Sequence, residues 1–347
     1  MIVFLAALLP RATIAWLAPA VSGDWETYRI VAENILINGC VSLSAPEGGA
    51  CSPHWGGNQL PGFPTFIAVV WSLTTKSWYP IALMHSVLFA CATTYLFCTL
   101  RAALAGRAVA LVAALLVALS PLTIPWARFP LTETLTLAAT IWLFSELIWS
   151  LSERKLRLFS IAAAFAIACF LRYDSILLAL PIAFVGFYLH RPWVALQRGL
   201  VIVLIAAVPL GGWWLRSVAA GLGPLPHTNF SPIIGALPKG YLAWGETWVR
   251  NQYQAKSWIY PIHKATYSTI RIDPLIYSNK NERQQVEALL RELAAYDNQN
   301  FPGHIDAVFQ DIADARRARY WLDYYFIRPF SHASTLWFNP LNSAGWP

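Results

Sequence analysis

Long apolar runs alternate with short polar connections from the start of the chain to about residue 216. A helix needs roughly 20 apolar residues to cross a bilayer, and several of these runs approach that length. The first run contains Pro10 and Arg11, which predicts a kinked or shortened helix. It lacks the combination of a basic start and a later small-residue cleavage site that marks a signal peptide. We expect about seven transmembrane helices, at residues 1–20, 79–100, 108–124, 131–149, 158–173, 175–190 and 199–215.

The composition agrees with this pattern. Hydrophobic residues make up 57% of the chain and charged residues only 12%, with a mean hydropathy of +0.47. These values lie outside the range of soluble globular proteins. The net charge of +7 is not gathered in a basic run, which argues against a nucleic-acid partner. The sequence therefore predicts an all-α, polytopic integral membrane protein surrounded by membrane lipids.

Lysine and arginine gather in every second connection between the predicted spans. By the positive-inside rule, these connections face the cytoplasm. The first long loop, residues 22–77, and the region after Arg216 are then predicted on the noncytoplasmic side. The basic connections contain Arg101, Arg107, Arg154, Lys155, Arg157, Arg191 and Arg198.

Residues 24–36 in the first long loop carry a helical pattern, because apolar residues recur there at steps of three and four. Such an amphipathic helix is expected to lie along the membrane plane. The apolar stripe consists of Trp25, Tyr28, Ala32, Ile35 and Leu36, and the opposite face of Glu26, Arg29 and Glu33.

Residues 217–347 form a mixed polar and aromatic region with helical patterns at 282–296 and 305–326. We therefore expect two parts: a transmembrane module at 1–216 and an extracytoplasmic helical region at 217–347. No internal repeat is visible along the chain.

The five cysteines fall into two groups. Cys91, Cys98 and Cys169 lie in apolar runs, where a free thiol usually serves core packing. Cys40 and Cys51 lie in the first long loop, where an oxidising compartment favours a disulfide between them. A pair of metal ligands is the alternative, although neither a CxxC motif nor histidine spacing supports it.

Four short motifs occur in a particular order along the predicted topology. They are Asp24-x-x-x-Tyr28 after the first span, Gln59-x-Pro61-Gly62-Phe63-Pro64 before a hydrophobic helix, Thr132-Glu133 at the outer start of the fourth span, and Trp214-Leu215-Arg216 at the end of the seventh. Together they resemble the GT-C class of membrane glycosyltransferases, closest to the protein O-mannosyltransferase and lipid A aminoarabinose transferase branch. The resemblance covers residues 1–216 well and the tail only loosely.

The resemblance implies an inverting glycosyltransferase that moves a sugar from a polyprenyl-phosphate carrier to a lipid, glycan or protein acceptor. It implies a seven-helix module with its site on the noncytoplasmic face, in a bacterial inner membrane. Asp24 then corresponds to the catalytic acid of the first loop and Glu26 to a second acid. The chain is short for this class, which leads us to expect weak activity or a missing C-terminal part.

The chemistry of such a transfer assigns roles to further residues. A base must take the proton of the acceptor hydroxyl, and cations must hold the charge that develops on the leaving phosphate. Asp24 is our candidate base. Guanidinium groups suit phosphate oxygens. The candidate substrate- and phosphate-binding residues are Arg128, Glu133, Arg172, Arg216 and Tyr28.

Several of these residues also have simple structural interpretations. Asp24 after Ser22-Gly23 suits an N-cap, and Glu26 suits a solvated first-turn acid. Arg172 pairs equally well with Asp174 across a tight turn.

Arg128 and His54 also have both a structural and a functional interpretation. Arg128 suits an interfacial anchor. His54 suits an ordinary loop residue, or with Asp24 and Glu26 a ligand of a divalent metal ion.

Two other classes of function remain open at this stage. A transporter or flippase of a lipid-linked substrate would be expected to show paired, interrupted helices in two repeated halves, which this sequence lacks. A noncatalytic membrane scaffold that binds partners through its tail is the other alternative.

Overall fold

The computed structural model describes residues 1–19, 23–43, 60–103, 106–219, 230–231, 235–249 and 252–330. Contacts divide the chain into two compact units, which we call unit 1 (Met1–Trp55 and Gln59–Leu225) and unit 2 (Gly56–Asn58 and Pro226–Pro347). The described residues are almost wholly helical, apart from the paired two-residue strands β1 (Phe230–Ser231) and β2 (Gly235–Ala236). The predicted helical class is confirmed. The boundary expected after residue 216 falls inside a helix.

A helix lies at the position of every one of the predicted apolar spans. Unit 1 also contains α3, an apolar helix that begins within the Gln59 to Pro64 motif, in the region predicted as the first long loop. The elements of unit 1 are α1 (Ile2–Leu17), α2 (Gly23–Asn38), α3 (Gly62–Leu73), α4 (Trp78–Ala103), α5 (Arg107–Ala118), η1 (Pro125–Arg128), α6 (Thr132–Glu153), α7 (Leu158–Leu171), η2 (Tyr173–Leu178), α8 (Ala179–Leu189) and α9 (Pro192–Ala219).

Three of these helices, α4, α6 and α9, are long and apolar enough to cross a membrane. At 1.5 Å per residue they measure about 39, 33 and 42 Å, against a hydrocarbon core of about 30 Å. The other apolar helices in the described part of the chain have between 11 and 16 residues. The structure therefore supports a helical protein with membrane-spanning character, but not the predicted count of seven full-length spans. A hydropathy window counts the turn residues on either side of a short helix as part of a span.

The outer surface of α9 is apolar. Of its 28 residues, only Ala195, Ile202 and Ala206 are buried, and large side chains such as Leu200 and Leu204 are exposed. A helix that is hydrophobic on all sides belongs in a protein core or in a membrane. Since α9 faces outward in the fold of unit 1, its outer face suits lipid.

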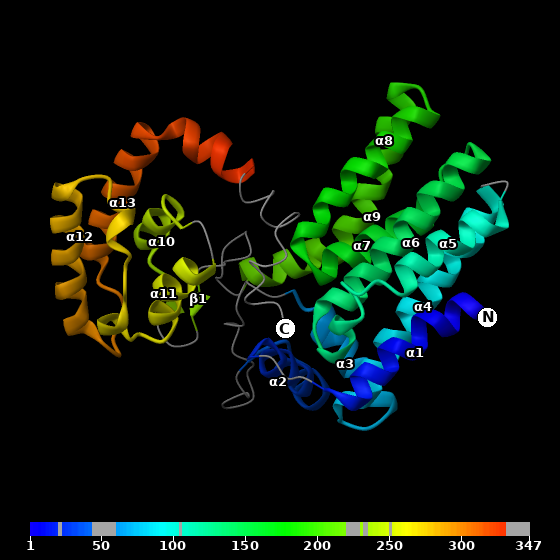
Figure 1. Ribbon diagram of the computed structural model, residues 1–347, viewed down its shortest axis with the longest axis horizontal. Helices are drawn as coiled ribbons and strands as arrows, with labels where there is room; N and C mark the ends of the chain where they lie inside the picture. The colour runs from blue at the N-terminus through cyan, green and yellow to red at the C-terminus, as the bar shows by residue number, and fades with distance from the viewer. Residues whose placement is uncertain are drawn as a thin grey trace. The chain divides into compact units, whose positions relative to one another are not determined.

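The helices of unit 1 form a bundle with α6 near its middle. α6 packs against α4 and α7, while α4 also packs against α1 and α5, and α7 against α9. Figure 1 shows α2 and α3 at one end of this bundle, and the α6–α7 and α8–α9 connections at the other. The start of α6 and the end of α7 therefore lie near α2 and α3, whereas the α6–α7 connection lies at the opposite end of the bundle.

Buried Arg11 joins α1 to the end of α5. Its guanidinium donates to the carbonyl oxygen of Ala118 and, at 2.7 Å, to Thr123 Oγ1, and lies 3.6 Å from the ring centroid of Phe89. A cation at a helix C-terminus satisfies free carbonyl groups and interacts well with the helix dipole. The Pro10-Arg11 step therefore lies inside one helix, where the arginine fixes a neighbouring helix end.

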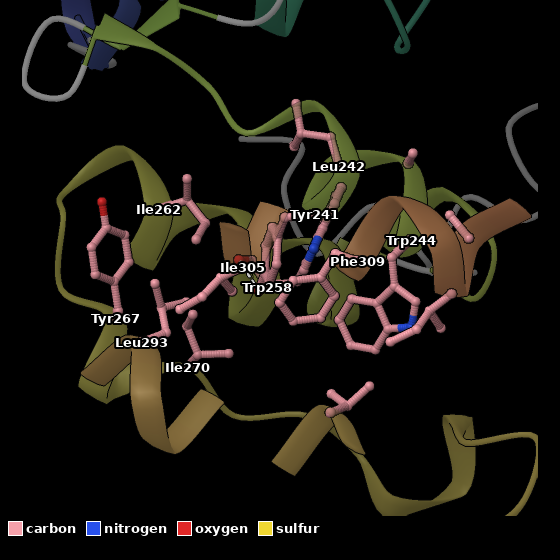
Figure 2. Packing of buried hydrophobic residues seen from close by; sticks show 14 of the residues in the cluster. Tyr241, Leu242, Trp244, Trp258, Ile262, Tyr267, Ile270, Leu293, Ile305 and Phe309 are labelled. Atoms are coloured by element: carbon pink, nitrogen blue, oxygen red, sulfur yellow. Dashed lines mark hydrogen bonds between the residues drawn. The ribbon is translucent and has the colours of Figure 1, made fainter. Parts of the chain in front are cut away.

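Unit 2 is a separate helical unit with an aromatic core. Figure 2 shows Tyr241, Trp258 and Phe309 packed together, with Tyr241 edge-on to Phe309 at a centroid distance of 5.0 Å. The helical patterns at 282–296 and 305–326 are confirmed by α12, η5, α13 and η6. The helices are α10 (Lys239–Glu246), α11 (Gln252–His263), η3 (Tyr267–Thr269), η4 (Pro274–Ile276), α12 (Lys280–Leu293), η5 (Ala294–Tyr296), α13 (Gly303–Arg319) and η6 (Asp323–Ile327).

Candidate active site

Helix α2 holds the first acidic residues against the end of the unit 1 bundle. Trp25, Tyr28 and Ala32 are buried in one hydrophobic cluster with Phe63 of α3, and Tyr28 lies edge-on to the Phe63 ring at 4.9 Å. Ile35 and Leu36 pack against the same cluster. The predicted apolar stripe is therefore confirmed.

The charged face of α2 is also as predicted. Arg29 donates from Nε to Glu26 Oε2 at 2.9 Å and from Nη1 to Glu33 Oε1 at 2.8 Å. Glu26 is half-exposed in this arrangement. Residues two positions apart on a helix do not share a face. Glu26 therefore points away from the side on which Asp24 and Tyr28 lie.

Asp24 differs from the predicted N-cap. Because α2 begins at Gly23, Asp24 lies inside the first helical turn. An acid there still gains about 0.3–1 kcal/mol from the helix dipole. Among the described residues, none forms a hydrogen bond or salt bridge with the exposed Asp24 carboxylate. Asp24 is thus an accessible carboxylate four residues before Tyr28, on the same side of the helix.

Tyr28 is the point at which three separate segments meet. Its hydroxyl hydrogen-bonds with Thr132 at the start of α6, and it lies within electrostatic range of Asp24, Glu133 and Arg172. Burial, followed by the charges of Asp24 and Glu133, raises the pKa of Tyr28 well above its usual value. The phenol therefore stays protonated at neutral pH and can donate a hydrogen bond.

Arg172, which follows the last residue of α7, lies between two carboxylates. Nη1 donates to Glu133 Oε1 at 2.9 Å, while Nε and Nη2 donate to Asp174 Oδ1 and Oδ2 at 3.1 and 3.2 Å. The predicted pairing of Arg172 with Asp174 is confirmed. These contacts use the Nε–H and one N–H on each terminal nitrogen, which leaves little of the guanidinium for a phosphate group.

Glu133 is only half satisfied. Its Oε1 accepts from Arg172, whereas its Oε2 is buried and has no hydrogen-bond partner among the described residues. Glu133 and Asp174 both pair with the Arg172 guanidinium, and Asp24 acts on Tyr28 beside them, so the cluster carries more negative than positive charge. Such a place suits a group that brings a proton, such as a hydroxyl, better than it suits a phosphate.

Arg216 lies elsewhere in unit 1, beside a cavity of about 710 Å³. Its Nη2 donates to the carbonyl oxygen of Val41 at 2.9 Å and its guanidinium stacks on Trp213, while its buried Nη1 has no partner in the described part of the chain. An arginine with a spare N–H beside a cavity suits an anionic group. The cavity is lined by Gly39, Cys40, Val41, Pro61, Thr65, Phe170, Val208, Pro209, Gly212, Trp213, Arg216 and Ala219.

The turn after α7 connects the acidic cluster to this cavity. Phe170 lines the cavity, Arg172 and Asp174 belong to the cluster, and Tyr173 between them hydrogen-bonds with Trp213 of the cavity wall. The α3 backbone fixes the same turn, because a Cβ atom on Gly62 would lie 2.4 Å from the Phe170 carbonyl oxygen. Gly62 therefore permits the close approach that holds residues 170–174 in place.

The remaining candidates are not brought into the cluster. Arg128 lies on η1, with its guanidinium 4.9 Å from the Phe129 ring centroid, and the described contacts do not join it to Tyr28, Glu133 or Arg172. This arrangement is compatible with the anchoring role considered above. His54 and Cys51 lie outside the described residues.

The described cysteines are in two states, disulfide-bonded and free. Cys40 is disulfide-bonded, whereas Cys91, Cys98 and Cys169 are free thiols. Within the described ranges, no group of three histidine, cysteine or acidic side chains has the arrangement of a metal site. A divalent ion therefore stays a sequence-based prediction, since it involves His54.

Sequence reasoning missed some residues of the site and a second polar cluster. Tyr173 carries no charge, and only its contact with Trp213 reveals it. Thr132 belongs to the Thr132-Glu133 motif, but its contact with Tyr28 emerges only from the fold. Glu146, by contrast, stands within a predicted span, and an ionisable residue there signals a paired or functional role. Its buried side chain pairs with Arg157, which is itself 40% exposed.

Comparison with known proteins does not assign this chain to a family or a function. No family model, no curated protein and no solved structure matches this chain.

Proposed function

We propose that this protein is a membrane glycosyltransferase that moves a sugar from a polyprenyl-phosphate carrier to a hydroxyl-bearing acceptor. The observation that carries the proposal is the meeting of Asp24, Tyr28, Glu133 and Arg172 from three segments far apart in the sequence. Asp24, Tyr28 and Glu133 belong to the sequence motifs, and Arg172 was a candidate because it is an arginine at the end of a predicted span. A chance set of surface charges would have no reason to converge on one buried tyrosine.

In the proposed reaction, the acceptor hydroxyl oxygen attacks the anomeric carbon of the sugar while the bond from that carbon to the phosphate oxygen breaks. Asp24 takes the hydroxyl proton, and Glu133 and the Tyr28 hydroxyl orient the acceptor. The polyprenyl phosphate leaves with the electron pair, and the configuration at the anomeric carbon inverts. Arg172 holds Glu133 in position rather than binding the phosphate.

Arg216 is the proposed contact for the leaving phosphate, because its Nη1 has no partner among the described residues. An almost wholly apolar cavity of about 600 Å³ between α3, α4, α6 and α7 shares Thr65 and Phe170 with the Arg216 cavity. Its lining, which includes Phe66 and Trp142, suits an isoprenoid chain. The Arg216 cavity would accommodate the charged headgroup of the donor, and the adjoining apolar cavity its isoprenoid chain.

The experiment is a transfer assay with purified protein in liposomes. A labelled polyprenyl-phosphate sugar is supplied with lipid, glycan and peptide acceptors, and both product formation and movement of the donor across the bilayer are measured. Labelled product supports the proposal. Donor movement without product identifies a flippase, and neither result identifies a noncatalytic protein.

The proposed location is the bacterial inner membrane, with the site on the noncytoplasmic face and the basic connections in the cytoplasm. We predict that single cysteines at Ser44 and Ser278 react with a membrane-impermeant thiol reagent from the same, outer side of intact cells. Arg154→Cys is the matched control and should react only after the cells are opened. Labelling of Ser44→Cys and Ser278→Cys from opposite sides would contradict the proposed topology.

A further inference from the structure

The segment of unit 2 that follows α13 carries its apolar side chains on the outside. It comprises residues 320–330, includes η6, and follows α13 as the orange-to-red part of the chain in Figure 1. We call it the aromatic segment. Its exposed large side chains are Tyr320, Trp321, Leu322, Tyr325, Phe326, Ile327 and Phe330.

The polar side chains of this segment face the rest of unit 2. Arg328 donates to the Glu246 carbonyl oxygen at 2.8 Å and to Asp323 Oδ2 at 2.6 Å, and the Tyr324 hydroxyl donates to Glu246 Oε2 at 3.2 Å. Glu246 is the last residue of α10, so these bonds fasten the segment to the unit. The Arg328 side chain is only 11% exposed, whereas Phe330 is 75% exposed.

This arrangement is the reverse of a water-facing helix, which buries apolar side chains and exposes charged ones. Contiguous exposed apolar surface on a soluble unit marks a site of contact with a protein or a membrane. The segment is held in place by its polar contacts, so the outward direction of Trp321, Phe326 and Phe330 is built into the fold of unit 2. An apolar environment must therefore meet this face.

The size and chemistry of the face favour lipid over another protein. A stable protein interface uses about 20–30 residues on each side, whereas the exposed large side chains of this segment are the seven named above. Tryptophan and tyrosine next to arginine are typical of the membrane–water interface. Arg319 adjoins the segment with its guanidinium over the Tyr320 ring, and no acidic residue in the described ranges pairs with it. A positive charge at this position matches anionic lipid headgroups.

We propose that the aromatic segment docks unit 2 on an anionic bilayer surface. Trp321, Phe326 and Phe330 enter the boundary between headgroups and acyl chains, and Arg319 contacts lipid phosphate. The bonds to Glu246 fix the segment to α10 of unit 2. This proposal does not depend on sugar transfer, so an inactive protein would still show it.

The test uses the full chain reconstituted in vesicles of phosphatidylcholine and phosphatidylglycerol. A spin label is placed at Phe326→Cys, with a matched label at Ala307→Cys on the exposed side of α13, both with Cys91, Cys98 and Cys169 replaced by alanine. Collision with oxygen, which concentrates in lipid, is compared with collision with a water-soluble nickel chelate. We expect the label at position 326 to collide more with oxygen and the label at 307 more with nickel.

Two results at position 326 would overturn the proposal: full access to nickel, which means water, or shielding from both reagents, which means protein contact. The charge contribution is tested with vesicles of phosphatidylcholine alone and with Arg319→Glu. We expect shallower immersion of the 326 label in both cases. Equal immersion in all samples would overturn the requirement for anionic lipid.

Discussion

Two glutamates of α6 each receive an arginine from an end of α7, and the two pairs differ in how well they are satisfied. Glu146 Oε1 accepts from the Tyr95 hydroxyl at 2.8 Å and from Trp142 Nε1 at 3.2 Å, and its Oε2 accepts from Arg157 Nη1 at 3.1 Å. Arg157 also lies over the Trp149 ring. One buried carboxylate, one cation and two neutral donors therefore form a closed network.

The pair at the other end of the same helices is open. Glu133 Oε2 has no hydrogen-bond partner in the described residues, and the Glu133 side chain is 30% exposed. Asp174 adds a second carboxylate on Arg172, and Asp24 adds negative charge near Tyr28. Buried polar groups in proteins are nearly always satisfied, and exceptions deserve an explanation. The comparison suggests that the Glu146 network stabilises the bundle, whereas the Glu133 cluster retains unused capacity for a substrate.

The largest expected effect is on Asp24. We predict that Asp24→Asn lowers transfer by about 100- to 10,000-fold, because an amide cannot take the acceptor proton. Since Asp24 lies within the first turn of α2 and is not its cap, the change should cost only the dipole term of about 0.3–1 kcal/mol. Transfer rate and thermal unfolding are measured on the same preparation.

The control for Asp24→Asn is Asp24→Glu, which keeps the carboxylate and should regain part of the lost transfer. Near-normal transfer by Asp24→Asn would show that the residue only supports the helix, and the active-site assignment would then be wrong.

The sequence located much of the site but not its connections. Asp24, Glu133 and Arg172 stand out because each is a charge beside an apolar run, and the spacing of Asp24 and Tyr28 already places them on one side of a helix. The sequence pattern alone could not show that Asp174 and Glu133 both accept hydrogen bonds from the Arg172 guanidinium. The partners of an arginine depend on how separate segments pack together. The separate position of Arg216 likewise emerges only from the fold.

The count of seven full-length spans is unsupported for a related reason. Runs of apolar residues predict helices well, and a helix lies at each predicted position. Hydropathy does not give the length of the helix within an apolar run, and α5 and α8 are shorter than the roughly 20 residues that a spanning helix needs. The sequence also does not predict that the aromatic segment of unit 2 exposes its apolar side chains. Its periodicity fits a helix with either face turned inward.

The second prediction concerns the open pair. Glu133→Gln keeps the shape and a hydrogen bond to Arg172 but removes the charge, and we expect transfer to fall about 100-fold. Because both side chains of this pair are partly exposed, stability should change by only about 0–1 kcal/mol. Kinetics over a series of acceptor concentrations is the measurement, and unchanged transfer would remove Glu133 from the proposed site.

The third prediction concerns the closed pair. Glu146→Gln removes the charge from a buried carboxylate that accepts three hydrogen bonds, so we expect a stability loss of about 1.5–3 kcal/mol. Transfer per folded molecule should stay within about twofold, because the network serves packing. Thermal unfolding in detergent, followed by tryptophan fluorescence, measures the loss.

Glu153→Gln is the matched control for Glu146→Gln, since Glu153 is an exposed acid at the end of the same helix. If Glu146→Gln stays as stable as this control but loses transfer, the two pairs have the opposite roles to those assigned here.

The smallest effect is expected at Glu26, two residues from Asp24 on the same helix. Its carboxylate is 54% exposed and bound to Arg29, and exposed pairs three residues apart contribute little, about 0.2–0.5 kcal/mol. We predict that Glu26→Gln keeps transfer within about twofold and leaves thermal unfolding nearly unchanged. The same liposome assay compares it directly with Asp24→Asn, so that the two acids of one helical turn serve as each other's controls. A loss as large as that of Asp24→Asn would instead support the resemblance-based role of Glu26 as a second catalytic acid, and would mean that its pairing with Arg29 breaks when the donor binds.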